Sequence, residues 1–236
     1  MNILALDTCF DACSVAVGRR LRSLTPSISY ACEPMVTGHV ERLMPMIEMA
    51  MAETGMAFSE LQRIAIATGP GTFTGARIAV SAARALALAT GATIVTVSSL
   101  ELMAMNPVVA TDGADVLAIA TDARRGEVYF QSFHPRTLKP LTPPQVLPVA
   151  DAASLLARQS SVIAGSGADA IASEIRNIGG NARAICQDLL PEAIDMLFVS
   201  SEWPATTRVA PLYLRPPDAK PPAPSPYASG NAGISA

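Results

Sequence analysis

One stretch, residues 63–91, constrains the fold of this chain more than any other. It opens with a short apolar run, Ile64 to Thr68, which is typical of a buried strand. The turn Gly69-Pro70-Gly71 then breaks the strand, because glycine tolerates positive φ and proline fixes its own φ. A helix that ends at Gly91 follows, and after it comes a second apolar strand at 92–97. This order predicts a βαβ unit with a parallel strand pair and a right-handed crossover.

The helix that we expect over 75–90, capped by Thr72 or Thr74, carries rows of small residues on its surface. One row has a spacing of four residues and consists of Gly75, Ala79, Ala83 and Ala87. A second row contains Ile78, Ala82, Ala85 and Ala89. Small residues let a neighbouring backbone approach closely. Packing on its own sheet explains one row, so we expect the second row to contact another helix, internal or from a partner.

The turn at the start of this helix has an alternative interpretation as a phosphate site. A glycine-rich turn before a helix can bind phosphate through free amides and the helix dipole. The sequence Gly-Pro-Gly-Thr-Phe-Thr-Gly matches neither the P-loop nor the dinucleotide-binding pattern, and Pro70 removes one donor. Contact of Gly69, Gly71, Thr72 and Arg77 with a phosphate or nucleotide therefore stays open as the weaker hypothesis.

Composition limits the class of protein. Of 236 residues, 50% are hydrophobic and 16% are charged, which is enough apolar sequence for a substantial core. The net charge of −3 and the pI of about 5.4 argue against a broad basic surface for nucleic acid. The start of the chain does not resemble a signal peptide, and no uninterrupted apolar run of 18 residues predicts a membrane span. Four cysteines lack metal or redox spacing, so we expect reduced thiols in a cytoplasmic protein.

Elsewhere the patterns predict alternating strands and helices in two units. A first helix is expected within 39–53, where Pro45 should kink it or mark a restart and four methionines surround it. We expect the other strands at 2–8, 12–17, 24–30, 116–121, 127–133, 161–164 and 184–186, and the other helices at 98–105, 150–158, 168–177 and 191–198. The expected domains are 1–105, 106–215 and a Pro/Ala-rich disordered tail at 216–236.

Few residues are candidates for catalysis or metal binding. His39 and Glu41 are two apart, so they point to different sides of a helix and do not form a metal pair; we expect a surface or interface role for His39. Asp7 ends the first strand, where it could hold a hydrated cation, although bonding to turn amides is the preferred interpretation. Asp122 is expected to bond to the amides of its hairpin turn. We predict no catalytic residue and no metal site.

Six separate segments, in order from residue 3 to residue 215, resemble the TsaB (YeaZ) family. They are Ile3-Leu-Ala-Leu-Asp7-Thr8, His39-x-Glu41-x-Leu43-x-Pro45, Gly69-Pro-Gly-Thr-Phe-Thr-Gly75-x-Arg77, Ser98-Ser-Leu100, Asp122-Ala-Arg-Arg125 with Glu127-Val-Tyr129, and Pro211-x-Tyr-Leu-Arg215. The resemblance implies an α/β actin-like ATPase (ASKHA) fold of two ribonuclease-H-like subdomains with mixed sheets, the second shortened.

The resemblance also implies a function in tRNA modification. Members of the family are bacterial subunits of the complex that places a threonylcarbamoyl group on the adenosine 3′ of the anticodon in tRNAs reading ANN codons. Transfer is performed by the metal-bearing paralogue TsaD, and the ATPase TsaE resets the assembly. Members pair with TsaD, and also self-associate, through the N-terminal helices. On this basis the expected partner interface comprises His39, Glu41, Leu43, Met46, Ile47, Gly75, Ala79, Ala82 and Ala83.

The sequence itself favours a non-catalytic subunit. A phosphate-transferring actin-like protein needs glycine in the loop after its first strand, and here the loop is Asp7-Thr-Cys-Phe-Asp-Ala12. We therefore expect this chain alone to bind no cofactor, with ATP or ADP placed at the complex interface and tRNA bound through the complex. An independent ATPase or kinase is the alternative, and a glycoprotease-like peptidase ranks below it because no nucleophile and base are paired in the sequence.

Overall fold

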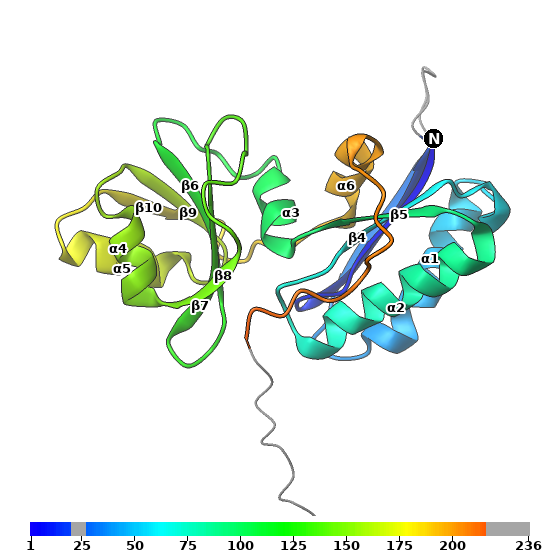
Figure 1. The fold of residues 1–236 in the computed structure, drawn as a ribbon, viewed down its shortest axis with the longest axis horizontal. Helices are drawn as coiled ribbons and strands as arrows, with labels where there is room; N and C mark the ends of the chain where they lie inside the picture. The colour runs from blue at the N-terminus through cyan, green and yellow to red at the C-terminus, as the bar shows by residue number, and fades with distance from the viewer. Residues whose placement is uncertain (20–26, 216–236) are drawn as a thin grey trace, which may run out of the picture.

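The computed structural model describes residues 1–19 and 27–215, and the strands among them form two five-stranded mixed sheets (Figure 1). The first sheet has the order β3-β2-β1-β4-β5 and the second has the order β10-β9-β6-β7-β8. The elements of the first half are β1 (Asn2–Asp7), β2 (Ala12–Arg19), β3 (Ile28–Pro34), α1 (His39–Glu53), the short 3-10 helix η1 (Phe58–Glu60), β4 (Arg63–Ala67), α2 (Phe73–Thr90), β5 (Thr93–Val97) and α3 (Ser99–Met105).

The second half repeats this arrangement. Its elements are β6 (Val116–Asp122), β7 (Glu127–Phe133), β8 (Gln145–Pro148), α4 (Val149–Leu156), β9 (Ser161–Ala164), α5 (Ala168–Asn177), β10 (Ala182–Ile185), α6 (Ala193–Val199) and the 3-10 helix η2 (Ser200–Glu202). In each half three antiparallel strands are followed by two parallel strands, each reached through a helix. The actin-like fold with two ribonuclease-H-like sheets is therefore confirmed.

The second half is shorter in its helices. Helix α4 has 8 residues where α1 has 15, and α5 has 10 residues where α2 has 18. The predicted βαβ unit is present, because β4 and β5 pair in parallel on either side of α2. Thr72 caps α2, with the Gly75 amide donating to its hydroxyl, and Gly91 ends the helix at φ 75°.

The last helix of each half packs on the sheet of the other half. Helix α3 lies against the second sheet, where Leu100 and Met103 join Leu117 and Phe133 in one core cluster. Helix α6 returns to the first sheet, where Met196 packs with strand residues of β1, β2 and β4. Figure 1 shows α3 and α6 between the two sheets, with α1 and α2 side by side on the outer face of the first. The sequence analysis did not predict this exchange, and the domain limits proposed there stay a prediction.

Several predicted elements differ in detail. Strand β3 begins at Ile28, not at residue 24, and residues 24–26 lie outside the described residues. Strand β8 was not predicted, because its sequence Gln-Val-Leu-Pro is short and polar at both ends. Helix α1 runs continuously through the exposed Pro45, so this proline does not mark a restart. The predicted tail at 216–236 lies outside the described residues. In the part of the chain that the structure describes, no helix has the length and apolar character to cross a bilayer.

Candidate functional site

Five of the six segments that carry the family resemblance meet at one end of the first sheet, and the sixth, at 122–129, lies in the second sheet. Strands β1 and β4 end here, and helices α1 and α2 both begin here. The loop after β1, residues 7–10, lies at the centre: Cys9 accepts a hydrogen bond from the Thr72 amide at 2.6 Å, and Phe10 O lies 3.0 Å from His39 Nε2. We call this assembly the motif end of the first sheet.

Glycines bring two backbone segments into contact at the motif end. A β-carbon on Gly71 would overlap the carbonyl of Cys9, and one on Gly75 would overlap the carbonyl of Thr8. The hydroxyl of Thr8 also donates to the Gly75 carbonyl at 2.7 Å. Gly69 uses the positive φ that glycine tolerates, at 110°, whereas Gly71 does not. Gly71 is required for space and not for its backbone conformation.

The amides that a phosphate would need are largely occupied by the chain itself. The Thr72 amide donates to Cys9, and the Gly75 amide donates to the Thr72 hydroxyl at 3.1 Å. Arg77 donates through Nε to the hydroxyl of Tyr213 at 2.7 Å. A phosphate at Gly69, Gly71, Thr72 and Arg77 would have to displace the loop after β1. The turn is thus a packed corner that fixes the start of α2.

Asp7 is completely buried under this corner. Its Oδ2 accepts a hydrogen bond from the Cys9 amide at 3.2 Å, which confirms the turn-bonding interpretation, and its Oδ1 has no partner among the described residues. Burial raises the pKa of Asp7 to about 7, against the smaller lowering effect of the bond from Cys9. The same burial raises the pKa of the neighbouring Cys9 thiol well above its usual value. A carboxyl that favours its neutral form in this way stabilises the corner without carrying a charge.

His39 is the first residue of α1 and has a structural role there. Its side chain is buried, and Nε2 donates to the Phe10 carbonyl, so the predicted surface role is wrong. The bond connects the start of α1 to the same loop that holds the start of α2. Within residues 1–19 and 27–215, no group of three or more His, Cys, Asp and Glu side chains is arranged to hold a metal ion. Cys9, Cys13, Cys32 and Cys186 are free thiols.

The segment 206–215 connects the motif end to the second half. Its Leu212 amide donates to the Thr68 carbonyl at 2.8 Å, and Tyr213 stacks on Phe73 with ring centroids 5.2 Å apart. Arg215 then forms an ion pair with Glu127 at the start of β7. Figure 1 shows this segment passing from the first half toward the second beside the start of α2. The resemblance at Pro211–Arg215 is thereby explained by contacts that hold the two halves together.

Most residues of the predicted partner interface lie in the core. The buried members are His39, Leu43, Met46, Ile47, Gly75, Ala79 and Ala83. Ala79 and Ala83 pack with Ile64 and Ile66 of β4, so this small-residue row faces the chain's own sheet. Glu41 is exposed and Ala82 is partly buried. The interface itself stays a prediction, but the buried side chains are not available to a partner in this structure.

Several apolar side chains on these two helices are exposed; the sequence analysis pointed to the methionines that surround 39–53 but named neither Val40 nor Leu88. On α1 these are Val40 (61% exposed), Met44 (38%) and Met49 (44%), and on α2 the main one is Leu88 (89%). Leu88 shares its helix face with the exposed Arg77, Ser81 and Arg84, at spacings of three and four residues. A leucine in a polar row is the sequence signal that could have indicated this face.

Comparison with known proteins identifies the family. The family model of TsaD, tRNA N6-adenosine threonylcarbamoyltransferase, matches residues 33–207. The tRNA threonylcarbamoyladenosine biosynthesis protein TsaB of Escherichia coli (strain K12) is 31% identical over 133 residues, which is 56% of this chain and 55% of that protein. TsaB of Bacillus subtilis (strain 168) is 32% identical over 129 residues, or 55% of this chain and 53% of that protein. The chain thus spans about half the length of these curated relatives.

Solved structures agree over nearly the whole chain. A Pseudomonas aeruginosa protein described as uncharacterized with similarity to peptidase YEAZ is 30% identical, with a TM-score of 0.73 over 91% of this chain and 99% of that one. A structure of YeaZ from the same organism has a TM-score of 0.71 at 30% identity, over 90% of this chain and 99% of that one. The motif end, the repeated sheets and these matches together show that the chain belongs to the TsaB (YeaZ) family.

Proposed function

We propose that this chain is a non-catalytic subunit of the cytoplasmic system that adds threonylcarbamoyl to the adenosine 3′ of the anticodon in tRNAs reading ANN codons. It acts by pairing with the catalytic subunit TsaD. The names of its relatives support the pathway. The observation that carries the pairing is the set of exposed apolar side chains on α1 and α2, namely Val40, Met44, Met49 and Leu88, which we call the apolar layer.

The layer has the chemistry of a protein interface. Exposed apolar side chains gathered on neighbouring helices mark association sites, and flexible methionines adapt to the surface of a partner. Exposed Glu41 and Glu48 lie between Met44 and Met49 around α1, so the proposed surface combines apolar and acidic side chains. A stable pair buries roughly 800 Å² on each partner. The proposal therefore assigns the contact with TsaD to these exposed residues and not to the small residues predicted from the sequence.

The packed corner supports the non-catalytic role. The loop after β1 has no glycine and packs against Gly71 and Gly75, so its backbone contacts the start of α2 instead of being open to a phosphate. Any ATP or ADP would then bind at the junction with TsaD, and the ATPase TsaE would act on the assembled pair. tRNA is bound by the complex and not by this chain alone.

The pairing is tested by co-purification with TsaD. Met44→Glu combined with Leu88→Arg places charges on the apolar layer. Met44 and Leu88 are both exposed, so we expect the double variant to fold. We expect pairing to weaken on the order of a hundredfold or more, because two buried charges would lack partners. The matched control is Leu155→Arg on α4, where Leu155 is 51% exposed in the second half. Pairing by the double variant at wild-type strength would refute the assignment.

A further inference from the structure

An aromatic and cationic cluster is exposed beside the apolar layer, where α2 begins. It consists of Phe73, Arg77 and Tyr213, which we call the stacking cluster. Phe73 is 53% exposed and Tyr213 is 46% exposed, although both are large apolar rings. Their ring planes are inclined by 28°, with centroids 5.2 Å apart. The stack helps to hold the segment 206–215 in place, yet it leaves about half of each ring exposed.

The geometry leaves one face of the Phe73 ring uncovered by the cluster. The Arg77 guanidinium lies 3.6 Å from the Phe73 centroid and 5.8 Å from the Tyr213 centroid. If Arg77 and Tyr213 lay on opposite faces of Phe73, their separation would approach the sum of their distances to that ring. They therefore share one side. Phe73 is a flat ring that is fixed from one side by a cation and a second ring.

Two further arginines are exposed at the hairpin between β6 and β7. Arg124 and Arg125 adopt φ values of 64° and 58°, and the Arg124 amide donates to Asp122 Oδ1 at 2.8 Å. The Glu127 amide donates to the Arg124 carbonyl at 3.1 Å, so the tip is held by its own backbone. Both arginine side chains are exposed.

The segment 206–215 brings the hairpin and the stacking cluster to the same part of the surface. Tyr213 belongs to the cluster, and two residues later Arg215 pairs with Glu127 at the base of the hairpin. This pair neutralises Glu127, which leaves Asp122 as the acidic side chain of the hairpin turn. Arg77 and Arg124 thus place positive charge in this region of a chain whose net charge is −3.

We propose that the stacking cluster and Arg124 of the hairpin form one contact for the RNA substrate. An unpaired base stacks on Phe73, and a nearby phosphate lies against Arg124. Aromatic rings backed by arginine bind unstacked bases of RNA, and arginines bind its phosphates. The charge of the region complements RNA, whereas the apolar layer of α1 and α2 suits a protein. This inference rests on the proposed function and assigns it an RNA-contacting surface.

The test uses the assembled complex with TsaD and an unmodified tRNA transcript as the probe. We expect Phe73→Leu, which keeps an apolar contact for Tyr213, to weaken tRNA binding by about tenfold at fixed salt. We expect Arg124→Gln to weaken binding and to lower the slope of log affinity against log salt by about 1. Co-purification with TsaD should be unchanged in both variants.

The matched controls are the same kinds of substitution at other exposed positions of the chain. Phe198→Leu on α6 changes a ring that is 61% exposed, and Arg176→Gln on α5 removes an exposed charge of the second half. Both should bind tRNA as wild type does. Wild-type tRNA affinity and salt slope in both test variants would overturn the RNA contact and leave the pairing proposal intact. Loss of TsaD pairing by Phe73→Leu would assign the cluster to the protein interface instead, and failure of the wild-type complex to bind tRNA would overturn the proposed function.

Discussion

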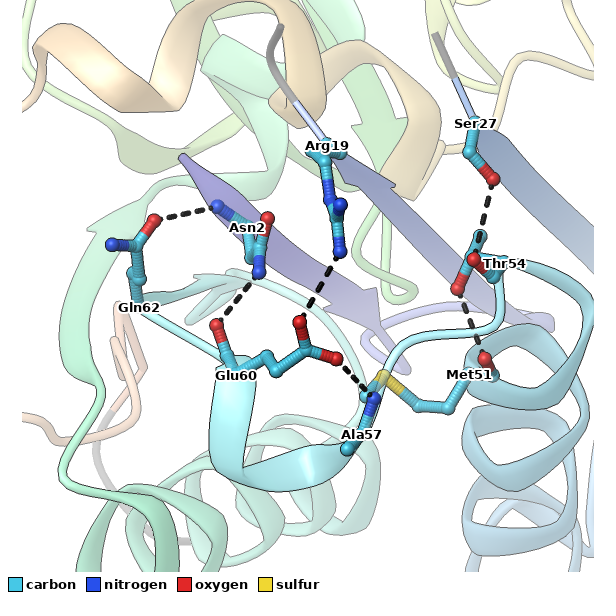
Figure 2. A network of polar contacts seen from close by, with 8 residues as sticks. All are labelled: Asn2, Arg19, Ser27, Met51, Thr54, Ala57, Glu60 and Gln62. Atoms are coloured by element: carbon cyan, nitrogen blue, oxygen red, sulfur yellow. Dashed lines mark hydrogen bonds and ion pairs between the residues drawn. The ribbon is translucent and has the colours of Figure 1, made fainter.

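The two ends of the first sheet are built in different ways. At the end where β1 begins, side chains make the connections, and Figure 2 shows them. The side-chain amide of Asn2 donates to the Glu60 carbonyl at 2.9 Å, Gln62 accepts from the Asn2 amide at 3.0 Å, and Arg19 pairs with Glu60 at 3.3 Å. At the motif end, where β1 stops, backbone packs directly on backbone at Gly71 and Gly75.

The difference indicates which end fixes the helices that carry the proposed partner surface. The polar contacts of Asn2, Arg19, Glu60 and Gln62 in Figure 2 are exposed, so water can replace each of them at low cost. At the motif end the contacts are buried and fix the starts of both α1 and α2, the helices that carry the apolar layer. A change there should alter stability strongly and should move the partner surface with it.

The largest expected effect is that of Gly75→Ala. Helix propensity alone would favour alanine, but its β-carbon would overlap the Thr8 carbonyl, so we expect a loss of about 3 kcal/mol or more in the free energy of unfolding. The control is Gly55→Ala near the opposite end. Gly55 has φ 62°, and the added β-carbon would meet no atom within 4 Å. Gly55→Ala should lower the free energy of unfolding by about 1 kcal/mol, because alanine is strained at a positive φ. Equal losses in urea denaturation would contradict the contrast between the ends.

The next effect is a pH dependence caused by Asp7. Its pKa is raised to about 7 in the folded chain from an ordinary value of 3.8, so the folded state holds a proton that the unfolded state has released. The contribution of Asp7 to the free energy of unfolding is fully present below the ordinary pKa. It falls as the pH rises toward 7, by roughly 3–4 kcal/mol in total.

Asp7→Asn isolates this contribution because the amide does not titrate. The difference in free energy of unfolding between wild type and the variant, measured from pH 4 to pH 8, should change steadily up to about pH 7 and then level off. Using the difference removes the parallel contribution of Asp195, whose pKa is raised to about 6 by burial and by Glu192. A constant difference across this range would show that Asp7 is ionised in the fold.

The smallest effect is expected at the polar end. Arg19→Gln removes the ion pair with Glu60 but leaves the bond from the Ala57 amide to Glu60 at 2.8 Å. Both charged side chains are more than a third exposed, so we expect a change below about 1 kcal/mol that vanishes at high salt. Thermal unfolding at two salt concentrations measures it. A larger loss would mean that the two ends do not differ as described.

The sequence predicted the fold better than it predicted the site. The βαβ unit, the cap at Thr72 and the end at Gly91 follow from local patterns, and the structure confirms them. The orientation of α2 did not follow, because a row of small residues can face a sheet or a partner equally well; here Ala79 and Ala83 face the sheet. The exchange of α3 and α6, and the contact of Arg215 with Glu127, depend on residues far apart in sequence.

The central claim is that α1 and α2 present the surface through which this chain serves tRNA modification. The most direct measurement is the threonylcarbamoyladenosine content of tRNA in cells that lack this gene and express variants in its place. We predict that wild type and Leu155→Arg restore the modified nucleoside, whereas Met44→Glu with Leu88→Arg does not, at equal protein levels. Full restoration by that double variant would contradict the claim.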